Sequence, residues 1–325
     1  MSGAALPEPG PHPELGPHPE LGPHPELGPL RPGARVGLVA PSGPPKPEQL
    51  ERAEEVLRGW GLEPVRGKHL LDQHPRAGYL AGTDADRASD LQDAWCDDSL
   101  DAVLCVRGCY GAVRVLDLLD VPKLASARPK PLLGSSDITA LHVFWAEELG
   151  LATWFTPMVA TGAFLDDPVA AAGVRRALFE PYAGTSYTGP AAEALVPGTA
   201  HGVLTGGNLA LLAMLNGART RKPVDNTGRI GLLEDVTEEP YRLDGMLQTL
   251  LRSGWFDGLT GLALGSWSEC GDLAEVRALC VELLAPLGIP LVWELGFGHG
   301  PAAHSIPLGV PATLTAGPQP QLVLD

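Results

Sequence analysis

Short apolar runs alternate with amphipathic segments through the first half of the chain. β-type runs that end in glycine or serine turns predict strands over residues 35–43, 62–67, 101–108 and 130–136. Apolar positions near helical spacing predict intervening helices over 46–61, 84–97, 112–120 and 137–144. This alternation indicates a parallel sheet covered on both faces, a flavodoxin-like α/β sandwich domain that we assign to residues 34–165.

The second half also alternates strands with helices and finishes in β-type runs. Strands are expected over 228–236, 258–267 and 289–300, and helices over 242–256 and 273–288. Because residues 304–325 add Pro- and Gly-rich β-type runs, residues 201–325 are predicted to form a C-terminal β-rich α/β domain. Proline- and glycine-rich turns over 166–200 indicate an interdomain linker.

A proline-rich repeat precedes both domains. The hexamer GPHPEL occurs three times over residues 10–27, and its two prolines per repeat prevent a helix and remove backbone donors. Residues 1–33 are therefore expected to be a disordered or extended tail. Its histidines, His12, His18 and His24, could hold a metal, but solvated side chains are the commoner outcome for such residues.

Composition narrows the class of protein. Apolar residues make up 44% of the 325 positions and charged residues 19%, which is typical of a globular chain with a core. No apolar run approaches the roughly 20 residues of a membrane span, and the N-terminus lacks the basic and apolar regions of a secretory signal. Five cysteines without a CxxC pair indicate reduced, mostly buried thiols and a cytoplasmic location.

The charge balance bears on partners. The chain has 23 lysines and arginines against 39 aspartates and glutamates, a formal net charge of −16. Such a balance argues against a protein that binds a nucleic-acid backbone. The cysteines form no metal-ligand cluster, and we expect neither a metal nor a cofactor.

Two adjacent serines, Ser135 and Ser136, stand where the strand over 130–136 meets the next helix. Ligands of parallel α/β sheets bind at the carboxyl ends of strands, and a helix N-terminus there favours the negative charge of an oxyanion. A nucleophile is one interpretation. The other is a simple N-cap, a position at which serine is strongly preferred, and the stretch is not a G-x-S-x-G elbow. On these residues alone, both interpretations stand.

A serine nucleophile needs a base and a carboxylate that orients the base. Among nine histidines, His299 lies in the glycine-rich loop 296–300 directly after an apolar strand, with His304 as a nearby competitor. His142 follows Ser136 on the same predicted helix at a spacing that points it away. Glu234 ends the strand over 228–236, where a carboxylate is costly unless it has a partner. An ordinary solvated carboxylate of the acidic loop that follows is the alternative.

Taken in order, several stretches resemble the serine LD-carboxypeptidases, also called muramoyltetrapeptide carboxypeptidases. The stretches are "GYLAGTDADRASDLQDAW" (78–95), "RGCYGAVRVL" (107–116), "GSSDITAL" (134–141), "LTGGNLALL" (204–212), "LLEDVTEEPYRLDGML" (232–247), "LALGSW" (262–267) and "LGFGHGPAAHSIPLG" (295–309). The resemblance runs from about residue 35 to about residue 322. It implies a metal-free Ser-His-Glu triad of Ser136, His299 and Glu234, in the cleft between the two domains.

The resemblance also implies an oxyanion hole made of backbone amides. One donor belongs to Asp137, and the other belongs to the turn at Gly108 and Cys109. Cysteine replaces the second glycine of the family's turn, so a positive φ at Cys109 would be strained. The neighbouring Arg107 and Tyr110 are candidates for substrate contacts, and Arg107 could equally be structural.

The implied substrate is a murein tetrapeptide, cleaved at an L,D peptide bond to release D-alanine during cell-wall recycling in the cytoplasm. The resemblance further implies a homodimer. Two other functions remain open. The microcin C self-immunity peptidases of the same family cleave peptidyl-nucleotide antibiotics with the same triad. A non-catalytic module could instead hold a murein peptide in the same cleft.

Overall fold

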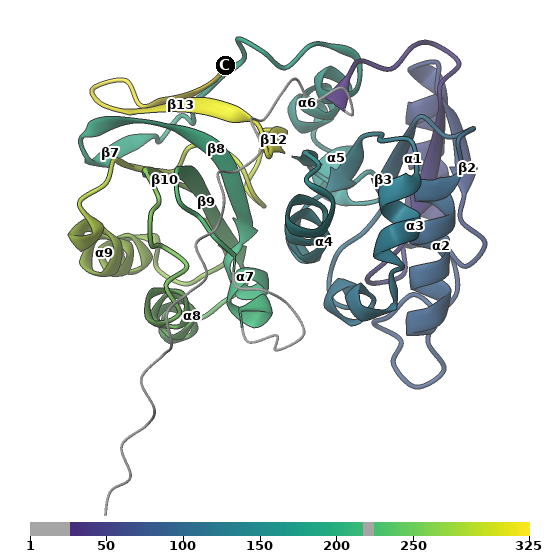
Figure 1. Cartoon of the computed structure of the whole chain (residues 1–325), viewed down its shortest axis with the longest axis horizontal. Helices are drawn as coiled ribbons and strands as arrows, with labels where there is room; N and C mark the ends of the chain where they lie inside the picture. The colour runs from purple at the N-terminus through teal and green to yellow at the C-terminus, as the bar shows by residue number, and fades with distance from the viewer. Residues whose placement is uncertain (1–26, 217–223) are drawn as a thin grey trace, which may run out of the picture.

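The computed structural model describes residues 27–216 and 224–325, which form two β-sheets flanked by helices (Figure 1). The first sheet has the strand order β12-β5-β4-β3-β1-β2, and its five neighbouring N-terminal strands are all parallel. These strands are β1 (Arg35–Val39), β2 (Glu63–Arg66), β3 (Ala102–Cys105), β4 (Leu132–Gly134) and β5 (Thr153–Phe155). The predicted parallel α/β sheet is confirmed.

Helices cover both faces of the first sheet because successive side chains of its strands point to opposite sides. Val36 and Leu38 of β1 pack in the core that includes α1 (Pro47–Gly59) and α6 (Pro168–Phe179). Val39 packs in the core on the other side, with α2 (Asp84–Cys96), α3 (Val121–Ser126) and α4 (Thr139–Phe144). A capping box between Thr83 and Asp86 begins α2.

The second sheet has the order β6-β14-β13-β8-β9-β10-β11-β7. Strands β8 to β11 are parallel, and antiparallel strands flank them on both sides. Helices α8 (Pro240–Arg252) and α9 (Leu273–Leu284) bury their apolar stripes against it, together with α7 (Leu209–Leu215). The strands are β6 (Ser186–Tyr187), β7 (Glu193–Val196), β8 (Gly198–Asn208), β9 (Arg229–Val236), β10 (Gly261–Ser268), β11 (Leu291–Trp293), β13 (Pro311–Ala316) and β14 (Gln321–Leu324). The mixed α/β fold with a β-rich second half is confirmed.

Two connections join the halves more closely than the sequence suggests. Residues 166–200 contain α6, which follows the short helix α5 (Gly162–Leu165), and β6, β7 and the start of β8 of the second sheet. Strand β12 (Ile306–Leu308) returns from the C-terminal half to pair antiparallel with β5.

The segment before β1 packs against α6. Leu27 is already buried, and the Leu30 N–H donates to the carbonyl of Leu178. The predicted tail over 1–33 lies mostly outside the described residues, with all three of its histidines.

Two predicted elements are wrong in detail. The helix expected over 112–120 is a pair of 3₁₀ turns, Ala112–Arg114 and Leu116–Leu118, because Asp120 caps a new helix, α3, directly after them. The strand expected over 289–300 ends at Trp293. There Glu294 (φ 53°) and Gly296 (φ 95°) turn the backbone into the left-handed region.

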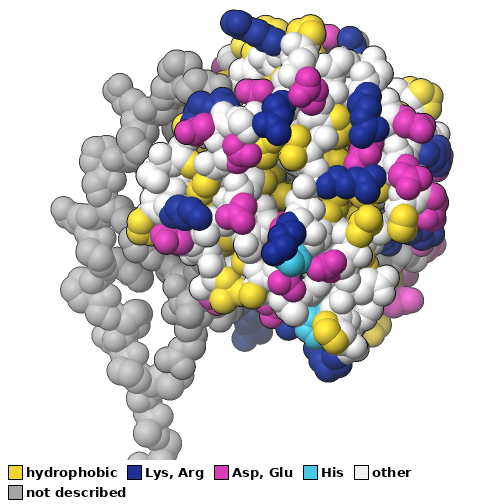
Figure 2. Space-filling model, turned by 90° about the vertical axis from the view of Figure 1, so that its right-hand side faces the viewer, with side chains coloured by type: hydrophobic (Ala, Val, Ile, Leu, Met, Phe, Trp, Pro, Cys, Tyr) yellow, Lys and Arg dark blue, Asp and Glu magenta, His cyan; other side chains and the backbone are white. Residues whose placement is uncertain are grey.

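The surface and the helix lengths add two observations. On the face shown in Figure 2, side chains of both charge signs are interspersed over the described part of the molecule. Within residues 27–216 and 224–325, we find no helix with the length and apolar character that crossing a bilayer requires.

His142 provides a stability prediction. Burial lowers its pKa from 6.5 to about 4, although Nε2 lies 3.0 Å from the Gly134 carbonyl. Between about pH 6.5 and pH 4, this residue is therefore protonated in the unfolded chain but neutral in the folded chain. Stability should fall by about 3 kcal/mol from this group as the pH drops through that window. In His142→Phe, denaturant titrations between pH 7 and pH 4 should show a correspondingly shallower loss, and an unchanged slope would contradict this account.

Candidate active site

Ser136 stands at a strained turn directly after β4. Its φ is +59°, a left-handed conformation that is uncommon for residues other than glycine. Gly134 makes the turn possible, because a Cβ there would lie 2.8 Å from the Ile138 side chain. Ser136 is partly exposed, whereas Ser135 is buried in an extended conformation and its side chain makes no capping hydrogen bond. The geometry separates the two serines and favours Ser136 as the reactive one.

The turn that includes Gly108 lies against this serine. A Cβ on Gly108 would lie 3.2 Å from Cβ of Ser136 and 3.3 Å from its Oγ, tighter than ordinary van der Waals contact, so glycine favours this close approach. Cys109 has a φ of +87° and is exposed, and Gly111 has a φ of +134°. The left-handed conformation of Cys109 is the strained one anticipated for a cysteine at this position.

Glu234, in the C-terminal half of β9, is in contact with His299, in the loop that follows β11. Oε2 of the fully buried Glu234 lies 2.6 Å from Nδ1 of His299. A carboxylate can only accept, so Nδ1 carries the proton and Nε2 remains available as a base. The Ser266 hydroxyl fixes the histidine loop by accepting from the N–H groups of His299 (2.8 Å) and Gly300 (2.9 Å).

Glycine at position 298 is required for this packing. Its φ is +110°, and a Cβ there would lie only 2.7 Å from both Oε2 of Glu234 and Oγ of Ser266. The glycine-rich loop that singled out His299 in the sequence therefore allows the ring to approach the buried carboxylate.

The electrostatics of the pair follow from two opposing effects. Burial alone would lower the pKa of His299, but the charge and hydrogen bond of Glu234, aided by Asp235, raise it above the ordinary 6.5. Burial, together with the charge of Glu234, raises the pKa of Asp235 to about 6. The site therefore stabilises a protonated His299, the form that results when the ring accepts a proton from a nucleophile.

Asn208 is a further site residue, which the sequence analysis did not single out. Its side-chain amide donates to Oε1 of Glu234 (3.3 Å) and Oδ1 of Asp235 (2.9 Å), and its backbone N–H donates to Oγ1 of Thr139 (2.9 Å). Thr139 follows Ser136 by one turn, so Asn208 connects the serine's helix to the acid. The signal was the stretch "GGN" at the junction of β8 and α7, where a Cβ on Gly207 would lie 2.5 Å from Oγ1 of Thr139.

Other sequence candidates have different surroundings. Nε2 of His304 lies 2.9 Å from the Thr188 carbonyl, and its ring packs beside Tyr187. The ring of Tyr110 makes an edge contact with Tyr79. Among the described residues, neither Arg107 nor the hydroxyl of Ser136 has a hydrogen bond within the chain, so Ser136 and His299 are not joined directly.

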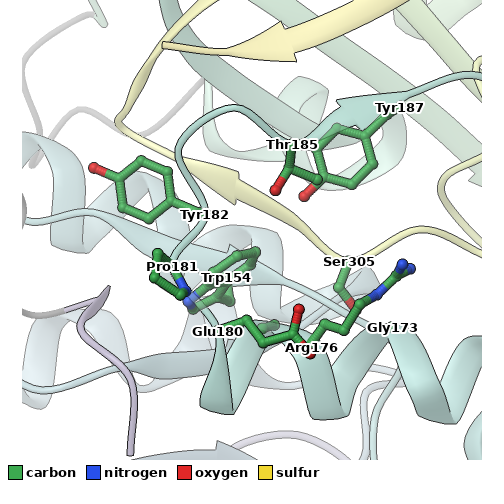
Figure 3. Close-up of a pocket in the computed structure, with 10 residues that line it drawn as sticks. Trp154, Gly173, Arg176, Glu180, Pro181, Tyr182, Thr185, Tyr187 and Ser305 are labelled. Carbon is green, nitrogen blue, oxygen red and sulfur yellow. The ribbon is translucent and has the colours of Figure 1, made fainter.

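One small pocket lies away from these groups, between β5, α6 and the segment that contains Tyr187 (Figure 3). Its lining includes none of Ser136, Glu234 and His299, and its volume is about 40 Å³. Within the described chain, the buried Trp154 Nε1 and Ser305 Oγ lack protein partners. Ordered water fits a polar cavity of this size, whereas a peptide does not.

The raised pKa of His299 predicts a pH profile. A general base must be neutral, and the neutral fraction of His299 grows as the pH rises through its pKa. The acid limb of kcat/KM should therefore lie above pH 6.5, the ordinary histidine value. Glu234→Gln removes the charge that raises this pKa, so its residual activity should have an acid limb at lower pH. A limb that stays in place in Glu234→Gln would contradict the assignment of His299 as the titrating base.

This arrangement and the fold are typical of serine-type hydrolases, since a nucleophile, a base and an orienting acid come from separate strands and the loops that follow them. Residues 36–156 match the family model of the LD-carboxypeptidase N-terminal domain, and residues 201–314 match that of the C-terminal domain. The chain belongs to the LD-carboxypeptidase family and is a serine-type carboxypeptidase.

Individual relatives of this chain have names that describe carboxypeptidases. A Streptomyces coelicolor protein, whose name also describes a carboxypeptidase, is 50% identical over 88% of this chain and 92% of its own length. The murein tetrapeptide carboxypeptidase of Pseudomonas aeruginosa is 33% identical over 86% of this chain and 92% of its own.

Solved structures share the architecture. The muramoyltetrapeptide carboxypeptidase from Oxalobacter formigenes has a TM-score of 0.77 at 27% identity, covering 90% of this chain and 99% of that one. The microcin C7 self immunity protein has a TM-score of 0.81 at 20% identity, covering 91% and 97%, which shows a common fold.

Proposed function

We propose that this carboxypeptidase hydrolyses the L,D peptide bond of a murein tetrapeptide and releases its terminal D-alanine. The observation that carries the proposal is the contact of 2.6 Å between Glu234 and His299, which prepares a base within the same fold as a strained, accessible Ser136. The murein-peptide names of the relatives from Pseudomonas aeruginosa and Oxalobacter formigenes support the substrate class.

In the proposed mechanism, Nε2 of His299 accepts the proton of the Ser136 hydroxyl as Oγ attacks the carbonyl carbon of the scissile bond. Glu234 keeps the ring in the correct tautomer and stabilises its protonated form. His299 then returns the proton to the departing amine of D-alanine. Water, activated by the same histidine, hydrolyses the acyl-enzyme and regenerates the serine.

The developing oxyanion needs donors in place before the reaction. The backbone N–H of Asp137 lies at the start of the 3₁₀ turn Ser136–Ile138, and the turn at Gly108 and Cys109 lies against Ser136. We propose these amides as the oxyanion hole. Arg107 and Tyr110 extend the same turn, and we propose that Arg107 binds the terminal carboxylate of the peptide, a group for which guanidinium is well suited.

The proposal includes a cytoplasmic role in cell-wall recycling and a homodimer, as for the family that the sequence resembles. The specific alternative is a peptidyl-nucleotide substrate, favoured by the fold shared with the microcin C7 self immunity protein. Both reactions use the same triad, so they differ only in what the substrate-binding residues accept.

A single comparison separates these substrates. Purified protein is given the murein tetrapeptide and, separately, a processed microcin C analogue, and kcat/KM is measured for both. We expect the tetrapeptide to have the larger value. A larger value for the nucleotide conjugate would overturn the substrate assignment and leave the serine mechanism intact.

A further inference from the structure

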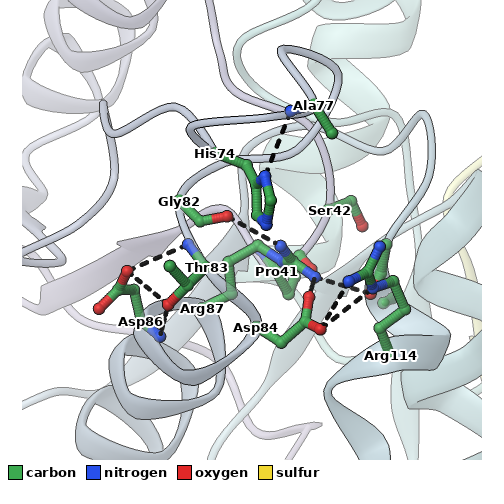
Figure 4. Close-up of polar contacts among 12 residues, drawn as sticks. Pro41, Ser42, His74, Ala77, Gly82, Thr83, Asp84, Asp86, Arg87 and Arg114 are labelled. Carbon is green, nitrogen blue, oxygen red and sulfur yellow. Dashed lines mark hydrogen bonds and ion pairs between the residues drawn. The ribbon is translucent and has the colours of Figure 1, made fainter.

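The guanidinium of Arg87 is buried beneath the loops that follow β1 and β3 (Figure 4). Its side chain is 1% exposed, and it donates from α2 to the carbonyl oxygens of Pro41 (2.9 Å), Gly82 (3.1 Å) and Gly111 (3.3 Å). It also pairs with Asp84 at 2.7 Å. One buried cation thus connects segments that are far apart in the sequence.

A second buried group connects the same loops to the nucleophile. The carboxylate of Asp137, the residue after Ser136, is fully buried, and its Oδ2 accepts from the hydroxyl of Ser42 and from the backbone N–H of Ala112 (2.7 Å). Ser42 follows the Pro41 that Arg87 binds, and Ala112 follows the Gly111 that Arg87 binds. The two side chains therefore hold adjacent residues of the same two loops.

These contacts lie next to the proposed oxyanion hole, which indicates that they do more than stabilise the fold. Gly108 and Cys109 lie between β3 and the Gly111–Ala112 step, and the Gly43 N–H donates to the Gly108 carbonyl at 2.9 Å. The loop after β1, the turn at 107–112 and the Ser136 turn are thus fixed to one another at a single edge of the sheet. Cys109 holds a left-handed conformation that its side chain disfavours, so the turn needs such external restraint.

We propose that Arg87 and Asp137 are positioning residues for the oxyanion hole, in which the Asp137 carboxylate and the Arg87 guanidinium together hold the 107–112 turn against Ser136. This inference rests on the proposed roles of Ser136 and its neighbouring amides. A displacement of about 1 Å in such a site costs roughly 100-fold in rate. Loss of the restraint should therefore lower kcat more than it raises KM.

Arg87→Lys tests the proposal, because an ammonium keeps the charge but cannot reproduce the planar fork that serves several carbonyls at once. We expect kcat to fall about 10- to 100-fold with KM nearly unchanged. Asp137→Ala should have a similar effect. Asp137→Asn should recover much of the loss, since its amide oxygen can accept the same two hydrogen bonds.

Lys130→Met is the matched control for stability. Lys130 is also 1% exposed and donates to the Asp97 carbonyl at 2.6 Å. However, it lies just before the amino end of β4, whereas Ser136 follows the carboxyl end of that strand. The substitution Lys130→Met should lower Tm without lowering kcat. Each variant is assayed at the same number of degrees below its own Tm. The proposal would be overturned if kcat of Arg87→Lys equalled that of the wild type, or if it fell no further than kcat of Lys130→Met.

A fluorophosphonate probe keeps this test separate from the identity of the substrate. Its rate of covalent reaction with Ser136, located by peptide mass spectrometry, depends on the nucleophile and the oxyanion donors. Slower labelling in Arg87→Lys and Asp137→Ala than in Lys130→Met supports the positioning role even if the tetrapeptide is not turned over. Equal labelling rates in all three variants contradict it, and failure to label wild-type Ser136 refutes the assigned nucleophile on which it rests.

Discussion

Replacing Ser136 by alanine should abolish the release of D-alanine, with kcat falling by about 10⁴- to 10⁶-fold. The hydroxyl provides the atom that forms the acyl-enzyme, and the remaining site provides only binding and oxyanion stabilisation. The substitution removes a single oxygen from a partly exposed side chain, so the fold should be retained. Coupled detection of free D-alanine, with Tm measured on the same preparations, gives the result.

Ser135→Ala is the matched control for that experiment. Ser135 is 4% exposed and makes no capping hydrogen bond through its side chain, so its loss should change turnover only a few-fold. Substantial turnover in Ser136→Ala, or a loss in Ser135→Ala as large as that in Ser136→Ala, would mean that the nucleophile has been assigned to the wrong serine.

The second large effect is expected for His299→Ala, which should lower kcat by about 10⁴-fold or more. Without the ring, the serine hydroxyl has no acceptor for its proton, and Glu234 remains buried without the group it orients. Steady-state turnover of the tetrapeptide measures the loss. Added imidazole should restore part of the activity, because it can occupy the space of the missing ring.

His304→Gln distinguishes the two histidines that the sequence offered. Its side chain can still donate to the Thr188 carbonyl, so the local structure should be kept and turnover should remain near that of the wild type. A loss in His304→Gln comparable to that in His299→Ala would contradict the choice of His299 as the base.

The fold class and the acid–base pair could be predicted from local patterns. Alternating runs and amphipathic segments identified the parallel sheet. The positions of Glu234 and His299 in or after predicted strands singled them out, and the structure shows their contact. A buried carboxylate at a strand end needs a partner, which is a physical requirement visible in the sequence. Local reasoning alone left Ser135 and Ser136 undecided, and the positive φ and partial exposure of Ser136 now favour it.

Long-range contacts explain what the sequence could not show. Asn208 reads as an ordinary N-cap of α7, and only the packing of β8 beside β9 brings its amide to Glu234. The sequence analysis does not single out Arg87, because its contacts with Pro41 and Gly111 come from segments far away in the chain. The pairing of β12 with β5 joins residues about 150 positions apart, which no local pattern specifies.

Hydrolysis of a murein tetrapeptide by the wild-type protein tests the central claim most directly. The protein is incubated with the peptide without added metal, and products are quantified by mass spectrometry together with free D-alanine. The account predicts tripeptide and D-alanine in equal amounts over many turnovers. Tight binding of the tetrapeptide by folded protein, with neither product formed, would contradict it and indicate a binding module.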